Sequence, residues 1–291
     1  MIATRLSQGF GLVLAGLLFL FFVISPGVVD PEFAGMIYAV LALVVGVLFA
    51  GLFFALRLAT GGSTIFWSGT RPPTRQVRWI FAMIGTALAI QLSAGGILEL
   101  GGWLNEETST ALALLVWTTV PATFLVSRRV EWPRRLKKAS VRRLVLTGVV
   151  ALGSAAAVSQ LKFAAAPADY VLPSALPLLI GLCGILVMAT AEEVVMRLLL
   201  LTALLDLTRS RFNALFLSSL VFALVHVPLE FAQTIIQMDW PYLLSSAVAY
   251  LPAFLMQMLM GLFLGVLWMR TGSISLIALT HAIANVGPAL L

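Results

Sequence analysis

The feature that most constrains this chain is a series of long, unbroken apolar stretches, each about as long as a bilayer is thick. Of its 291 residues, 61% are apolar and only 10% are charged, whereas soluble domains carry about 25% charged residues. A helix crosses a bilayer with about twenty apolar residues, and only helices and closed barrels satisfy the backbone in lipid. A barrel would show short alternating strands. We therefore predict an all-α, polytopic transmembrane helical bundle.

The apolar stretches predict about nine spans. They lie at residues 9–25, 34–56, 79–98, 109–127, 144–161, 174–204, 212–229, 242–269 and 273–290. Basic residues gather in alternate connections, most densely between 128 and 143, and acidic residues dominate the other connections. Because positive residues mark the cytoplasmic side, we predict a cytoplasmic N-terminus and, with nine spans, an external C-terminus.

The basic loop divides the chain into two parts, residues 1–143 and residues 144–291. The net charge of +6 is explained by topology signals that also touch anionic lipid, so nucleic acid is not an expected partner. All the ionisable groups inside predicted spans lie in the second part. The first part is predicted to be a set of transmembrane helices whose role the sequence does not reveal.

Six polar residues interrupt three of the last spans, where a bilayer should disfavour them. They are Glu192, Glu193, Arg197, His226, His281 and Asn285, and they include both histidines of the chain. An ionisable group at membrane depth marks a functional site by default. Counted from the nearest cytoplasmic charges at 1.5 Å per residue, Glu192, His226 and His281 lie roughly 21, 22 and 16 Å deep. This similar depth predicts that the three helices bring them together.

The spacing within each helix suggests different tasks. Glu193 and Arg197 are four residues apart, which suits an ion pair on one helix face. Glu192 is turned by about 100° from Glu193, so it remains a free carboxylate in an apolar setting, suited to general-base catalysis. His281 and Asn285 also lie four residues apart and could donate together to a developing oxyanion. Each feature alone is more typical of a structural role, and only the set favours a site.

These residues resemble the motifs of a known family, the type II CAAX prenyl endopeptidases, or CPBP family. The string from Ala191 to Arg197 resembles its EExxxR motif, the string from Phe222 to His226 its FxxxH motif, and the string from His281 to Asn285 its HxxxN motif. The segments 261–265 and 270–273 resemble its glycine-spaced helix and RTGS turn. The resemblance covers roughly 174–291. It departs mildly at Met196 and Leu198, where many bacterial members have an aromatic residue and a glycine.

The resemblance implies an intramembrane endopeptidase, with a role for each motif residue. Glu192 and His226 are expected to activate a water molecule, and His281 and Asn285 to hold the oxyanion. Glu193 and Arg197 are expected to position the site or contact the substrate. Family members were long described as metalloproteases, so zinc held by Glu192, His226 and His281 is the alternative. The HExxH pattern is absent, and we favour a mechanism with no cofactor.

The expected partners are membrane lipids and a peptide or protein substrate at the membrane, with or without a lipid modification. The expected location is the bacterial cytoplasmic membrane. Two other functions stay open. A proton-coupled transporter would also use buried Glu, Arg and His, although we detect no inverted repeat. A non-catalytic CPBP-type scaffold would regulate a partner membrane protein.

Overall fold

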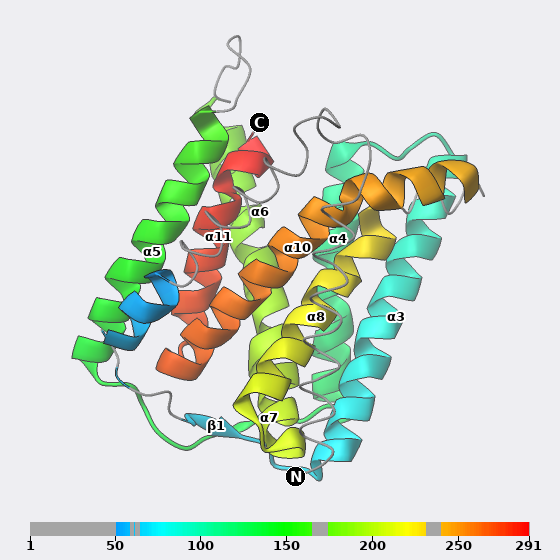
Figure 1. Ribbon diagram of the computed structural model, residues 1–291. Coiled ribbons are helices and arrows are strands. Elements are labelled where there is room, and N and C mark those ends of the chain that lie inside the picture. The colour runs from blue at the N-terminus through cyan, green and yellow to red at the C-terminus, as the bar shows by residue number, and fades with distance from the viewer. Residues whose placement is uncertain (1–50, 59–60, 62–64, 165–173, 231–239, 291) are drawn as a thin grey trace.

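The computed structural model describes residues 51–58, 61, 65–164, 174–230 and 240–290 (Figure 1). Its N-terminal part contains β1 (Trp67–Ser68), α3 (Pro73–Leu100), α4 (Glu106–Val126), β2 (Arg134–Arg135) and α5 (Val141–Ala164). Its C-terminal part contains α6 (Ala175–Glu193), the π-helix η1 (Val194–Leu201), α7 (Thr202–Thr208), α8 (Arg211–Glu230), α10 (Trp240–Thr271) and α11 (Ile274–Leu290). The order confirms the predicted all-α class, because the two strands have only two residues each.

Six of the described helical stretches are long and apolar enough to cross a membrane, which makes this an integral membrane protein. The longest, Ala175–Thr208, joins α6, η1 and α7, and α11 contributes a shorter apolar stretch, Ile274–Val286. Each predicted span from residue 79 onward corresponds to one of these helices. The span at 9–25 and most of the span at 34–56 lie outside the described residues, so the structure does not confirm the count of nine.

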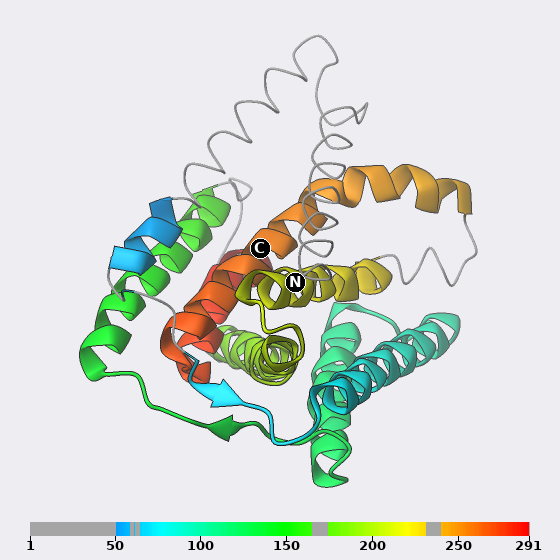
Figure 2. The same cartoon turned by 60° about the horizontal axis from the view of Figure 1, so that its bottom comes forward.

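The helices form a bundle with η1 at its centre. Figure 1 and Figure 2 show α5 and α11 on one side, α3 and α4 on the other, and α8 and α10 crossing between them. The segment η1 touches α3, α8 and α10. Every residue from Val195 to Leu201 is buried. A helix that is apolar almost all round is stable in such a central position, and here it carries one charged residue, Arg197.

The first motif helix contains one irregular stretch. Pro177 stands in the first turn of α6, where proline is tolerated. The irregular stretch is η1, which begins directly after Glu193. A π-helix widens the turn and is frequent at functional sites, so the backbone departs from α-helical geometry just where the first motif lies.

A short ribbon ties the N-terminal half to the C-terminal half at one end of the bundle. The strands β1 and β2 pair antiparallel, with Trp67 opposite Arg135. The indole Nε1–H of Trp67 donates to the carbonyl of Gly272 at 3.0 Å, and its ring stacks on Trp268. The Asp206 carboxylate accepts from the backbone N–H of Gly69 at 2.6 Å. The basic connections next to β1, α7 and the starts of α3 and α5 share this end (Figure 1), as the charge pattern predicts.

The turn between α10 and α11 gives a test of this packing. Gly272 has φ +57°, and a Cβ there would lie 2.5 Å from the Cβ of Phe66. Gly272→Ala should therefore lower the free energy of unfolding by about 1–3 kcal/mol through overpacking and backbone strain, measured as a lower Tm in detergent. The control is Gly85→Ala, because a Cβ at Gly85 meets nothing within 4 Å. Equal Tm values for the two variants would contradict the packing described here.

Candidate active site

The first motif forms a fully buried ion pair, as its spacing predicts. The side chains of Glu193 and Arg197 are both 0% exposed, and Arg197 Nε lies 3.2 Å from Glu193 Oε2. Within the described part of the chain, none of the three guanidinium nitrogens of Arg197 makes a hydrogen bond, so the contact at 3.2 Å is an ion pair whose N–H is not aimed at the oxygen. The guanidinium also lies over the ring of Phe222, with Cζ 4.7 Å from its centroid, which is a favourable cation–π distance.

His281 brings α11 to the same carboxylate. Its Nδ1 lies 2.9 Å from Glu193 Oε1, and since a carboxylate accepts, Nδ1–H donates. Its Nε2 lies 3.8 Å from Glu192 Oε2. The imidazole of His281 is buried and faces α6, and the predicted joint role with Asn285 stays a prediction. The physical reason for the contact with Glu193 is that its buried charge needs more than one partner.

His226 on α8 is held by its own helix. Its Nδ1 lies 2.7 Å from the backbone carbonyl oxygen of Phe222. A carbonyl can only accept, so Nδ1 carries the proton, and in the neutral ring Nε2 then keeps a lone pair. The ring of Phe222 contacts both imidazoles edge-on, with centroid distances of 4.9 Å to His226 and 5.8 Å to His281. Phe222 therefore packs between the three motif helices.

Glu192 and His226 face a common pocket of about 70 Å³. A water molecule needs about 10–15 Å³ of such space, so the pocket has room for a few waters. The C-terminal half also lines it with Met188, Met196, Phe222 and Val225, and the N-terminal half lines it with Gln91, Ala113 and Trp117. Among the described residues, His281 and Asn285 are not part of this lining. The pocket thus places a carboxylate beside an imidazole with a free lone pair.

The structure brings five of the six predicted residues into one cluster. Glu192, Glu193, Arg197, His226 and His281 are connected by the contacts above or by the shared pocket. Asn285 is half-buried one turn beyond His281 on α11.

Sequence reasoning missed two pocket residues, Gln91 on α3 and Trp117 on α4. The available signal was the polar side chain of Gln91 inside an apolar span. This signal is weaker than that of the motif residues, because Gln91 carries no charge.

The zinc alternative predicts that Glu192, His226 and His281 share one metal ion. Within the described residues, no three His, Cys, Asp or Glu side chains are grouped closely enough to hold a metal ion. The Nε2 of His281 is directed to Glu192, and its Nδ1 is bonded to Glu193. Zinc bound jointly by Glu192, His226 and His281 therefore stays a prediction.

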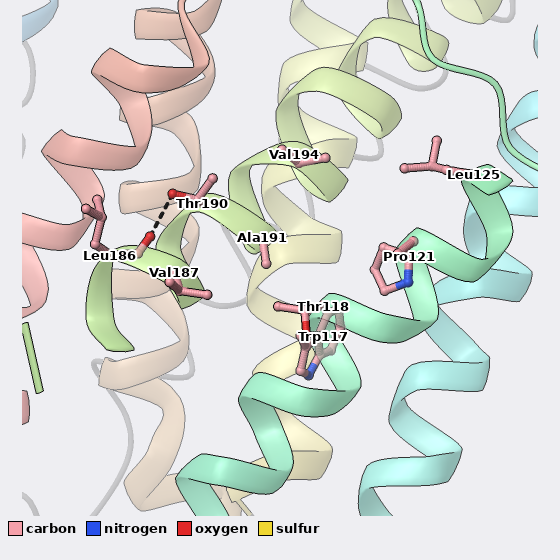
Figure 3. A pocket seen from close by; sticks show the side chains of 10 residues that line it. Trp117, Thr118, Pro121, Leu125, Leu186, Val187, Thr190, Ala191 and Val194 are labelled. Atoms are coloured by element: carbon pink, nitrogen blue, oxygen red, sulfur yellow. Dashed lines mark hydrogen bonds between the residues drawn. The ribbon is translucent and has the colours of Figure 1, made fainter. Parts of the chain in front are cut away.

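An apolar groove of about 460 Å³ runs beside the pocket, between α4 and α6 (Figure 3). Trp117 lines both the groove and the pocket. The groove is apolar although it contains Thr118 and Thr190, because each hydroxyl donates to a carbonyl of its own helix, at 2.6 and 2.7 Å. Its volume lies in the range of ligand sites, about 300–1,000 Å³.

Comparison with known proteins adds one match. Residues 174–287 match the family model described as type II CAAX prenyl endopeptidase Rce1-like. This segment is therefore similar to the domain of that family. The segment contains all six motif residues and begins at the start of α6, whereas α3, α4 and α5 lie outside it. No curated protein and no solved structure matches the chain. The family resemblance read from the motifs is confirmed.

The buried ion pair yields a prediction about stability. Glu193→Gln keeps an acceptor for His281 but leaves Arg197 as a buried cation without its counter-charge. We expect a loss of about 3–5 kcal/mol in the free energy of unfolding, seen as a lower Tm in detergent. The double variant Glu193→Gln/Arg197→Met removes both charges and should recover much of that loss. A double variant no more stable than Glu193→Gln would show that the ion pair is not what Glu193 stabilises.

Proposed function

We propose that this protein is an intramembrane endopeptidase that hydrolyses a peptide bond near the membrane, using water activated by Glu192 and His226. The observation that carries the proposal is that these two side chains line one pocket, with room for a few waters, inside an apolar bundle. The lone pair on His226 Nε2, which follows from the bond of Nδ1 to Phe222, adds support. An anionic or basic group beside a confined water is the arrangement that general-base catalysis requires.

The proposed reaction begins with a water molecule between Glu192 and His226. Glu192 accepts one proton of the water while its oxygen adds to the carbonyl carbon of the peptide, which gives a tetrahedral intermediate. The C–N bond then breaks, and the proton passes to the leaving nitrogen, so that a carboxylate and an amine are formed. His226 accepts a hydrogen bond from the water at Nε2 and orients it. This route uses only groups of the chain.

His281 and Asn285 are proposed to stabilise the oxyanion, as the HxxxN motif implies. The support for His281 is its Nε2, which lies 3.8 Å from the Glu192 carboxylate and so adjoins the reacting region. Because Nδ1–H is held by Glu193, Nε2 can donate to the oxyanion only when both ring nitrogens carry a proton, and that form is part of the proposal. The support for Asn285 is its position one turn further on the same helix. Glu193 and Arg197 are proposed to position the site, since Glu193 holds His281 and Arg197 neutralises Glu193.

The substrate is proposed to be a peptide or protein segment at the membrane, with or without an attached lipid. The apolar groove between α4 and α6 would seat its apolar part next to the pocket. Membrane lipids are the other expected contacts, at a bacterial cytoplasmic membrane, and nucleic acid is not an expected partner. A proton-coupled transporter or a CPBP-type scaffold would not hydrolyse peptides, so a cleavage assay separates these functions from the proposed one.

The direct test is cleavage of a membrane-tethered peptide library by the purified full chain in detergent. Glu192→Gln keeps the shape of the side chain but removes the base, so the rate should fall by about 10²–10⁴. Asn285→Ala removes an oxyanion donor, so the rate should fall by about 10²–10³. The matched control is Glu107→Gln, the same chemical change at an exposed position at the start of α4, which should cleave like the wild type.

Two outcomes would contradict the proposal. Full cleavage by Glu192→Gln would exclude the proposed base. Loss of wild-type cleavage with a chelator and its recovery with zinc would replace the metal-free route by a zinc-dependent one.

A further inference from the structure

Gln91 places the N-terminal half of the protein at the proposed catalytic pocket. It lies on α3, outside the segment that matches the family model, and its side chain lines the pocket with Glu192 and His226. A polar group inside an apolar bundle is costly unless it has a partner. Gln91 has one such partner, Trp117 on α4, whose indole Nε1 lies 2.7 Å from Gln91 Oε1.

This hydrogen bond fixes the orientation of the Gln91 carboxamide. An indole N–H can only donate, so the oxygen of Gln91 faces Trp117 and its NH₂ group, with two donors, is left for other partners. Within the described part of the chain, the hydrogen bond to Trp117 is the only one of the Gln91 side chain, and no group accepts from its NH₂. Trp117 is itself buried and lies at one end of the apolar groove (Figure 3). Its rigid indole therefore fixes the position of the Gln91 carboxamide through their hydrogen bond.

A peptide group bound in the pocket needs both acceptors and donors from the residues that line it. Glu192 offers carboxylate oxygens, and neutral His226 offers the lone pair on Nε2, so both accept. A peptide carbonyl bound in this pocket needs a donor. The other lining side chains are apolar except Trp117, whose N–H is already used. Gln91 is therefore the one donor with unused hydrogens among the described lining residues.

We propose that the NH₂ group of Gln91 donates a hydrogen bond to a carbonyl oxygen of the bound peptide substrate. Gln91 is then a substrate-contacting residue, and Trp117 is a positioning residue that orients it. The inference rests on the proposed peptidase function and assigns a part of it to α3 and α4. The rival interpretation is that Gln91 and Trp117 only join two helices, as polar pairs do in membrane proteins.

The test measures kcat/KM of the purified full chain on the library peptide that the wild type cleaves fastest. Gln91→Met keeps the length of the side chain and removes the donor, and should lower kcat/KM by about tenfold or more. The pH dependence of kcat/KM should stay unchanged, because the base itself is untouched. Thr86→Val is the control on the same helix: Thr86 is exposed, its hydroxyl bonds only to Ala82 of its own helix, and the variant should cleave like the wild type.

A double variant separates substrate contact from helix joining. Gln91→Met alone strands the buried N–H of Trp117 and could lower stability, whereas Gln91→Met/Trp117→Phe removes both partners, which is nearly neutral for folding. The proposal predicts that the double variant has the Tm of the wild type within a few degrees, yet a kcat/KM about tenfold or more below that of the wild type. A double variant as stable and as active as the wild type would overturn the proposal in favour of a helix-joining role.

Three other results of the cleavage assays would also decide whether Gln91 contacts the substrate. A loss of activity in Gln91→Met with a shifted pH profile would show that Gln91 acts on Glu192, and would overturn substrate contact. Full activity of Gln91→Met, in a protein whose Glu192→Gln variant is inactive, would overturn this inference and leave the proposed function intact. A wild-type protein that cleaves no member of the library would overturn the proposed function and this inference with it.

Discussion

The buried charge of Glu193 is the constraint on which the rest of the site depends. A carboxylate with no exposed surface inside an apolar bundle costs several kcal/mol unless its charge is compensated. Two cations or donors from different elements do this, Arg197 on η1 at 3.2 Å and His281 on α11 at 2.9 Å. Satisfying Glu193 therefore docks α11 against α6. The guanidinium in turn rests on Phe222, which draws α8 into the same packing.

Because Arg197 and His281 compensate the buried charge of Glu193, the neighbouring carboxylate of Glu192 remains available as the proposed base. The two carboxylates are adjacent in sequence but point to different surroundings: Glu193 into the buried cluster and Glu192 to the pocket shared with His226. Because the Nδ1 proton of His226 is bonded to the Phe222 carbonyl, its Nε2 is left for the pocket. The opposite wall comes from α3 and α4, where Trp117 separates the pocket from the apolar groove. One structural core thus supports a small polar pocket beside a larger apolar site.

Much of this organisation is readable from the sequence, and the exceptions have physical causes. Long apolar runs predict the helices after residue 79, and similar depth predicts the meeting of Glu192, His226 and His281. The π-helix after Glu193 leaves no composition signal, because its residues are apolar in either helical form. The contact of His281 with Glu193 depends on how α11 rotates against α6, which spacing within one helix does not determine. Gln91 and Trp117 meet the site only through packing of distant segments.

The central claim is that Glu192 acts as a base on a water molecule in the pocket, and a single turnover in H₂¹⁸O tests it most directly. The enzyme is mixed in excess with a cleavable membrane peptide, and the reaction is quenched after one turnover. The masses of the peptide product and of the enzyme segment containing Glu192 are then measured by mass spectrometry. The account predicts one ¹⁸O atom in the new carboxylate of the product and none in Glu192. An ¹⁸O atom in the Glu192 carboxylate would show attack on the peptide by Glu192 itself, and would contradict the account.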